Sequence, residues 1–300
     1  MVGLAGVIAT VVGARLLWPE VPAGIAMLVA VPLGVGLALW WRSRAEPGAA
    51  SNLGAALLAG TVAVAVFAVE ASRQAAVDQT SLQVTLSLQK DLTLVDLTGR
   101  DLSGLYLRGK ILNYAGMRQA NLTRADLREA KLVRADMRSA RLRSADLTGA
   151  DLPGAELPNA DLRDARLPSA DLSGADLSRA DLSRAEPFGA ALDYANLRSV
   201  VARDINLNHA SLTGADLTGA DLRRAGMVEA DLSSATLVRA YLRDGDLRGA
   251  DLGDADLRHA DLLRANLRGA VANSCTSWPA GFDPTRAGVK IKRVSGSECQ

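Results

Sequence analysis

The chain has 300 residues, and its 34 Lys and Arg nearly balance its 33 Asp and Glu, so the formal net charge is only +1. This balance by itself predicts no polyionic partner, and nucleic-acid binding is not expected from it. Hydrophobic residues make up 49% of the chain but aromatic residues only 4%, so Leu and Ala, and not large rings, must build the core.

The first part of the chain, residues 1–70, is predicted to be a membrane anchor with two or three transmembrane helices. Pro22–Trp41 is charge-free over about twenty residues, which is long enough to span a bilayer, and its terminal Trp pair suits the interface. Leu53–Val69 is a second charge-free run, near the minimum length for a span. Met1–Trp18 carries Arg15 and is a candidate third span. A buried helical hairpin is the alternative, and a cleaved signal peptide is disfavoured because no basic segment begins the chain.

The side of the membrane that holds the rest of the chain stays open. Arg42 and Arg44 lie between the two clear spans and favour a cytoplasmic loop, which would place the following residues outside. Arg73, Lys90 and the basic stretch after them favour the opposite orientation. Both orientations are therefore kept.

Residues 71–90 are predicted to be a linker that ends in a capping strand. A row of apolar side chains alternates with polar ones, as in a half-buried strand, at Leu82, Val84, Leu86 and Leu88. A cap is expected here because an open end of a stacked β-structure is a sheet edge that pairs with other chains.

Residues 91–272 repeat every five positions, most clearly in the stretch ADLTGADLPGAELPNADLRDA. A Leu or Met stands at nearly every fifth position from 92 to 267, and an Ala usually stands two places before it. A period of five fits neither an α-helix nor a flat strand, and strict self-similarity predicts a solenoid. We expect Leu and Ala to point inward, the other three residues to face water, and Gly in the last position to take a positive φ at a corner.

This pattern strongly resembles the motif A(D/N)LXX of the pentapeptide-repeat family, over about 60% of the chain. The resemblance implies an all-β fold, a right-handed quadrilateral β-helix with four pentapeptides per coil, here preceded by the α-helical transmembrane region. Coils then stack at about 4.8 Å. The tail TSWPAGFDPTRAGV and the lead-in SLQVTLSLQKDLTLVDL look like those of many actinobacterial members, so a membrane-anchored type in a bacterial plasma membrane is expected.

Two departures from the repeat carry predictions of their own. Val200 and Ile205 occupy inward Ala positions while Ala202 occupies a Leu position, so volume is roughly conserved and the phase should survive. Pro187 stands in a Leu position, where it removes one ladder donor and should weaken or bend the coil.

Residues 273–300 are predicted to cap the other end of the solenoid. Apolar and aromatic side chains that can cover the last coil recur there, at Trp278, Phe282, Val289 and Ile291. Cys275 and Cys299 are the only cysteines, and this rules out a zinc cluster of the usual spacing. They are either free thiols or a disulfide, and a disulfide requires an oxidising compartment.

No enzyme active site is expected. The only histidines, His209 and His259, fall in outward positions on opposite walls of a twenty-residue coil. The many aspartates are typical of turns, and no phosphate loop, nucleotide fingerprint or metal-ligand spacing occurs. No catalytic, metal or cofactor-binding residue is therefore predicted, and no small-molecule substrate.

Positions twenty apart should stack on one wall, and one wall then carries Arg at the corner of nearly every coil. The members of this arginine ridge are Arg124, Arg143, Arg163, Arg184, Arg203, Arg223, Arg224, Arg243 and Arg264. Two interpretations remain: a solvated wall in which Arg pairs with Asp161, Asp181, Asp221 and Asp261, or a docking face for an anionic partner. The opposite wall carries Arg134 and Tyr194 among small residues and aspartates, namely Asp151, Asp171, Asp231 and Asp251.

The function predicted from these features is a non-enzymatic, membrane-tethered scaffold that presents a rigid solenoid to an unknown, acidic protein partner, with the bilayer as second partner. Residues 108–143 hold about ten basic against three acidic residues, and if the repeats lie on the cytoplasmic face this basic end is a candidate contact for anionic lipid heads. The alternatives are a DNA-mimicking protein of the kind that protects gyrase, and an accessory protein of membrane transport. A nearly neutral repeat region argues against DNA mimicry.

Overall fold

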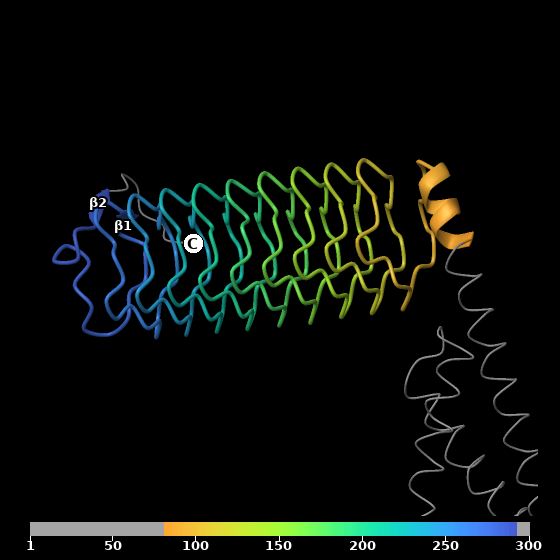
Figure 1. Cartoon of the computed structure of the whole chain (residues 1–300). Helices are drawn as coiled ribbons and strands as arrows, with labels where there is room; N and C mark the ends of the chain where they lie inside the picture. Colours follow the sequence, from red (N-terminus) through yellow and green to blue (C-terminus); the bar gives the residue numbers. More distant parts are fainter. Residues whose placement is uncertain (1–80, 293–300) are drawn as a thin grey trace, which may run out of the picture. The chain divides into compact units, whose positions relative to one another are not determined.

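The computed structural model describes residues 81–292 of the chain. Residues 81–88 are helical and precede a stack of coils that begins at residue 91 and ends in a two-stranded parallel sheet (Figure 1). From Gln83 onward these elements belong to one compact unit, Gln83–Gln300. Within residues 81–292 no helix is long and apolar enough to cross a bilayer, and the anchor predicted in residues 1–70 lies outside the described part.

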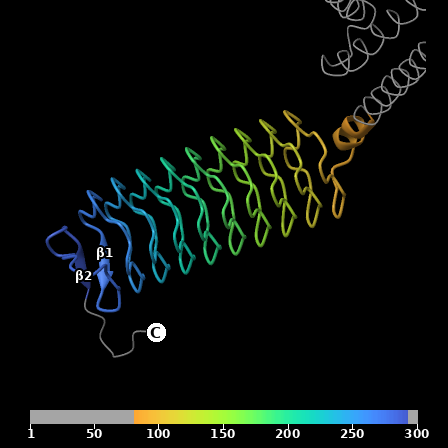
Figure 2. The same ribbon diagram turned by 90° about the horizontal axis from the view of Figure 1, so that it is seen from below.

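The coils are joined by parallel backbone pairing at a spacing of twenty residues. Asp91 pairs with Ile111, and the same register recurs at every fifth residue down the stack. The bonds are well formed: the N–H of Leu132 donates to the carbonyl of Asp151 at 2.6 Å. Seen from below, the coils repeat one behind another (Figure 2). The predicted solenoid with four pentapeptides per coil is thus confirmed.

Each pentapeptide ends in a corner that places one residue in the left-handed region. The series runs without interruption from Leu94, with φ of 63°, to Gly269, with φ of 76°. In a typical corner the N–H of Ala150 donates to the carbonyl of Leu147 at 3.0 Å, and Asp146 Oδ1 accepts the N–H of Thr148 at 3.0 Å. The positive φ expected for Gly therefore extends to residues as different as Arg, Ser, Asp and Tyr.

The core is a column of Leu and Met flanked by Ala. Leu162 and Ala165 have no exposed surface, and the same holds for most of their equivalents. The size exchange is accommodated as predicted, because Val200, Ala202 and Ile205 are only 1%, 2% and 3% exposed.

One rung of the ladder is missing at Pro187. The pairs Asp181–Val201 and Ala191–Ser211 form on either side. Between them, within the described residues, Glu186 and Asn206 do not pair. The proline nitrogen carries no hydrogen and so cannot donate to the next coil. The predicted loss of one ladder donor is thus confirmed, and the weakening of the coil stays a prediction.

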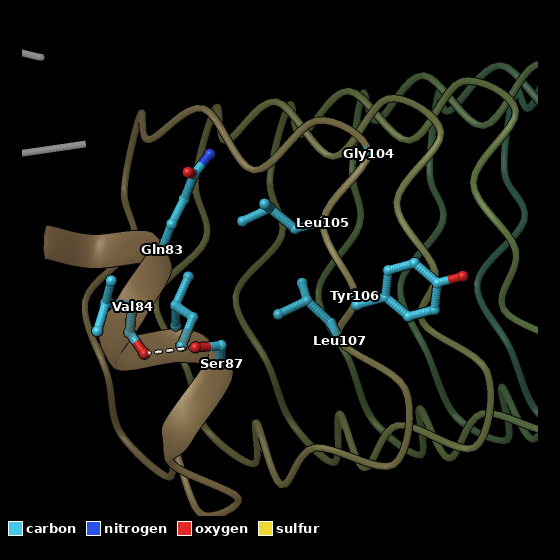
Figure 3. A pocket seen from close by; sticks show the side chains of 8 residues that line it. Gln83, Val84, Ser87, Gly104, Leu105, Tyr106 and Leu107 are labelled. Atoms are coloured by element: carbon cyan, nitrogen blue, oxygen red, sulfur yellow. Dashed lines mark hydrogen bonds between the residues drawn. The ribbon is translucent and has the colours of Figure 1, made fainter. Parts of the chain in front are cut away.

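The amino-terminal cap is a helix, so the strand predicted from Leu82, Val84, Leu86 and Leu88 is wrong. Residues 81–88 are helical, and this octapeptide also places apolar residues four apart, which fits one helix face as well as a strand. A helix satisfies its own backbone groups, so it covers the coil without needing a ladder partner. Leu86 is 2% exposed and lines a pocket of about 410 Å³ together with Leu105 and Leu107 (Figure 3).

A lysine from the first coil closes the end of this helix. Lys110 Nζ donates to the carbonyls of Ser87, at 3.0 Å, and Gln89, at 2.6 Å. Carbonyls at a helix carboxyl end lack intrahelical partners and attract cations. The side chain thus ties the cap to the solenoid.

The carboxyl-terminal cap is built by β1 (Val271–Asn273) and β2 (Lys290–Lys292), which pair in parallel. Trp278 and Phe282 stack with ring centroids 5.2 Å apart in the intervening loop. Val289 is 6% exposed, so the loop contributes to the core. Cys275 is disulfide-bonded, and Cys299, the only other cysteine, lies outside the described residues.

Candidate interaction surface

The structure places all nine arginines of the ridge on one wall. The wall is held in register by the pairs Asp161–Asp181, Val201–Asp221 and Tyr241–Asp261. The ridge does not present bare positive charge, however, because aspartates lie between the arginines in two parallel columns.

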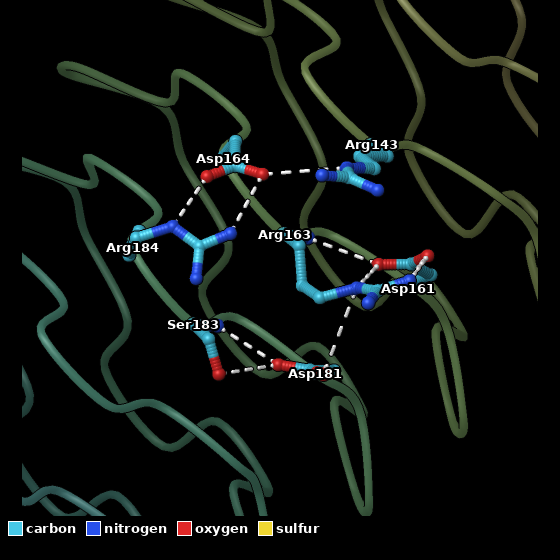
Figure 4. A network of polar contacts seen from close by, with 7 residues as sticks. All are labelled: Arg143, Asp161, Arg163, Asp164, Asp181, Ser183 and Arg184. Atoms are coloured by element: carbon cyan, nitrogen blue, oxygen red, sulfur yellow. Dashed lines mark hydrogen bonds and ion pairs between the residues drawn. The ribbon is translucent and has the colours of Figure 1, made fainter.

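The corner column alternates in sign from coil to coil. Arg184 Nε donates to Asp164 Oδ1 at 2.7 Å and its Nη2 to Oδ2 at 3.0 Å, a bidentate pair across two coils (Figure 4). The same arrangement recurs two and four coils further along the wall, in the pairs Arg224–Asp204, at 2.6 Å, and Arg264–Asp244, at 2.5 Å. The hydrogen bond from Arg184 lowers the pKa of Asp164, so this carboxylate stays ionised.

The second column is formed by the first and third residues of each pentapeptide on this wall, which precede the corner residue. Arg163 donates to Asp161 at 2.6 Å and lies 3.8 Å from Asp181 (Figure 4). Arg203 and Arg223 converge on Asp221, at 2.6 and 2.7 Å. Burial raises the pKa of Asp221, but the hydrogen bonds from Arg223 and Arg203 outweigh it and lower the pKa to about 2.

The remaining ridge members are Arg143, Arg243 and Arg124. Arg143 contacts Asp164 at 3.3 Å, and Arg243 contacts Asp261 at 3.1 Å. Arg124 makes no ion pair with any described carboxylate. The eight paired arginine side chains are still 40% to 66% exposed.

The sequence predicted four of the seven aspartates that pair with ridge arginines. Asp161, Asp181, Asp221 and Asp261 contact ridge arginines, as the solvated-wall interpretation expected. It missed the three corner aspartates, whose signal was their spacing: each stands twenty residues before an arginine, at Asp164, Asp204 and Asp244.

The opposite wall has a different charge pattern. Its aspartates make no ion pair within the described residues, and they are Asp91, Asp151, Asp171, Asp193, Asp231, Asp251 and Asp254. Tyr194 is 73% exposed on this wall, and its ring lies 2.7 Å from the place where a Cβ on Gly214 would be. The wall therefore carries carboxylates without ion pairs and Tyr194 at one corner, and Tyr114, 49% exposed, stands at the equivalent corner four coils earlier.

The histidines take the outward positions expected of them. His209 Nδ1 lies 3.3 Å from Glu229, and its ring meets Phe188 edge-on at 5.2 Å. His259 lies on another wall. No group of three or more metal-ligating side chains occurs in the described part of the chain.

The pentapeptide-repeat family matches residues 91–128, 120–157, 145–184, 190–227, 203–237 and 235–271. The one interruption, between 184 and 190, contains Pro187 and its missing rung. No curated protein matches the chain.

Several solved structures are similar. HetL of the cyanobacterium Nostoc sp. strain PCC 7120, a pentapeptide-repeat protein involved in heterocyst differentiation regulation, is 31% identical; the match covers 69% of this chain and 90% of HetL, with a TM-score of 0.32. Full-length QnrB1, a plasmid-mediated fluoroquinolone resistance protein, is 15% identical over 67% of this chain and 93% of its own, with a TM-score of 0.35. The repeat matches extend over more than half of the sequence, and the chain belongs to the pentapeptide-repeat family.

Proposed function

We propose that the chain is a non-enzymatic, membrane-tethered scaffold that docks a protein partner on the arginine ridge. Pentapeptide-repeat proteins are generally structural or interaction modules and not enzymes. The observation that carries the proposal is the alternating column Asp164–Arg184, Asp204–Arg224 and Asp244–Arg264. It is a rigid charge pattern repeated every second coil, at about 10 Å.

The aspartates orient the arginines for a partner. In Arg184, Nε and Nη2 are held by Asp164, while Nη1 has no partner among the described residues. A fixed guanidinium loses little side-chain entropy when it binds a further carboxylate. Because the wall is nearly neutral overall, such a surface selects its partner by charge pattern more than by long-range attraction.

The test exchanges ridge arginines in the full chain. In the variant Arg163→Gln, Arg184→Gln, Arg224→Gln and Arg264→Gln, folding should persist, because each exposed ion pair contributes only about 0–1 kcal/mol. Crosslinking in native membranes should lose the partner bands of the unaltered chain. The matched control changes four arginines of the adjacent wall, namely Arg118, Arg138, Arg198 and Arg258. Identical bands from both variants would remove the ridge as the docking face.

We place the solenoid on the extracytoplasmic side of a bacterial plasma membrane. Two features support this side: the disulfide of Cys275, which needs an oxidising compartment, and the positive charges Arg42 and Arg44 between the predicted spans. Labelling of single introduced cysteines from each side of the membrane tests it. A solenoid cysteine that reacts only after lysis would contradict the placement.

DNA mimicry is the second candidate, and the unpaired carboxylates of the opposite wall favour it. A protein of this kind presents regularly spaced negative charge in place of phosphates. Addition of the chain to a gyrase supercoiling assay decides between the two. Inhibition or protection that disappears in the variant Asp151→Asn, Asp171→Asn, Asp231→Asn would support mimicry, and an unchanged reaction would exclude it.

A further inference from the structure

We propose that the amino-terminal end of the solenoid is a binding surface for an anionic phospholipid membrane, and that this contact holds the rod upright on the bilayer. The inference rests on the proposed membrane tether and adds a second, separate contact with lipid. Its elements are the helix at 81–88 and the first three coils, 91–150.

The first argument is that arginines and lysines without an ion pair gather near this end of the stack. Besides Lys110, which binds two backbone carbonyls of the cap, six bases in residues 90–150 make no ion pair with a described acidic residue: Lys90, Arg100, Arg124, Lys131, Arg134 and Arg141. Across residues 151–267 only Arg179 and Arg239 share that property, and at the far end of the described residues Arg268, Arg286, Lys290 and Lys292 share it as well. All six lie within about 15 Å of the end of the stack. Bases without an ion pair to a described carboxylate leave their charge for lipid phosphates.

The second argument is the exposed apolar surface at the same end. Val84 is 52% exposed and Leu88 80% exposed on the capping helix, one turn apart, while Leu86 faces the core. Leu94 and Tyr106 follow on the first coil, at 73% and 78%. Aliphatic and tyrosine side chains beside bases are the composition of membrane-interface surfaces.

The third argument is the charge gradient along the rod. Residues 90–143 carry twelve bases against six acids, residues 144–267 carry thirteen bases against twenty-one acids, and residues 268–292 carry four bases against one acid. An anionic surface therefore repels the long middle of the rod and attracts its ends, and the proposed tether selects the first end. A rod with this polarity stands on the membrane and does not lie along it.

The orientation is measured with the full chain in vesicles of phosphatidylcholine with or without phosphatidylglycerol. A fluorescent donor at position 254 and an acceptor lipid report the distance of the far coils from the bilayer. An upright rod keeps the donor about 40 Å away, so transfer should be low with phosphatidylglycerol. Transfer should rise without phosphatidylglycerol or at high salt.

Variants locate the contact. Lys90→Gln, Arg100→Gln and Lys131→Gln together should raise transfer on anionic vesicles, and Leu88→Ser with Leu94→Ser should do the same. The matched control Arg179→Gln, Arg239→Gln and Arg268→Gln removes bases that also lack an ion pair but lie far from the end, and it should change nothing. Transfer that ignores lipid charge, or that responds equally to both sets, would overturn the proposal.

Flotation separates this inference from the tether. A tethered chain floats with purely neutral vesicles, and failure to do so defeats the tether alone. If the full chain does not float with neutral vesicles, it should still float with phosphatidylglycerol vesicles at low salt through the end surface. Since each base near an anionic surface strengthens binding about fivefold, the triple Gln variant should bind about a hundredfold less. Absence of flotation on anionic vesicles in that case would defeat the end surface.

Discussion

Each corner residue of this solenoid adopts a backbone conformation that most amino acids avoid. Ser169 and Arg179 have φ of 55° and 58°, which in an isolated chain costs about 1–2 kcal/mol per residue. The cost is offset because the corner is bonded on several sides: the N–H of Arg179 donates to the next coil at 3.0 Å, and Asp176 accepts the N–H of Ser178 at 2.9 Å. The hydrogen bonds within and between coils therefore set the conformation of the corner residue.

The exchanged trio in the core predicts a non-additive response to mutation. Ala202→Leu alone should destabilise the protein by about 1–3 kcal/mol, because Val200 and Ile205 already fill the volume. The triple variant Val200→Ala, Ala202→Leu and Ile205→Ala restores the common pattern and should recover most of that loss. Denaturant unfolding of the single and triple variants measures both. Equal losses would show that the sites do not share space.

Gly214 and Gly174 form a matched pair for the fixed tyrosine. Both have positive φ, 65° and 63°, but an added Cβ meets the Tyr194 ring at 2.7 Å only at Gly214. Gly174→Ala should cost about 1 kcal/mol, and Gly214→Ala should cost more because the ring must move. In a Tyr194→Ala background the two costs should become equal when measured by thermal unfolding. If the two costs still differ in the Tyr194→Ala background, the backbone at Gly214, and not the Tyr194 ring, causes the difference.

At the scale of elements, the amino-terminal cap is held to the first coil by one lysine. Lys110 secures the helix at 81–88 through two backbone carbonyls. Lys110→Met should cost about 1 kcal/mol and speed hydrogen exchange in the first coil, residues 91–110. Lys131→Met, one coil further along the same stack, is the control and should leave exchange there unchanged. Equal exchange in both variants would mean that Leu86 alone holds the cap.

The ridge wall predicts a loss of stability in acid. Asp221 has a folded pKa of about 2, below the value of about 3.9 in an unfolded chain. Its contribution, about 2 kcal/mol, is therefore complete above pH 4 and disappears as the pH falls toward 2. Asp221→Asn should flatten the pH dependence of unfolding in that window. Asp171→Asn, whose carboxylate has no arginine partner among the described residues, serves as the control.

The repeat, its twenty-residue coil, the missing rung at Pro187 and the members of the ridge all followed from spacing, because the core fixes the phase of every side chain. The cap at 81–88 did not, because eight residues satisfy a period of two and a period of four equally. Hydrogen bonds in which a side chain of the preceding coil replaces the corner aspartate were also missed. Val133 and Val228 lack the Asp that usually stands two residues earlier, and their N–H groups donate instead to Asn113 and Asn208, at 3.1 and 2.8 Å. Only the twenty-residue register reveals such partners.

At the scale of the whole molecule, the two ends are closed by different means. Cys275 is disulfide-bonded and Cys299 is the other cysteine of the sequence, so the carboxyl-terminal end is stabilised by a covalent bond. Reduction should then cost about 3 kcal/mol at this cap. Thermal unfolding with and without reductant measures the loss, and the variant Cys275→Ser with Cys299→Ser should be insensitive to reductant. A reductant effect that persists in this variant would exclude the bond as its cause.

The twenty-residue register also governs how the gene of such a protein can change in length. Duplication of one whole coil extends each wall and leaves every column continuous. Duplication of a single pentapeptide preserves the leucine axis equally well, yet it turns everything downstream by one side, so that the column containing Arg184 would continue on a neighbouring wall. Stability alone therefore permits growth in steps of five, whereas any surface that runs along a wall restricts growth to steps of twenty.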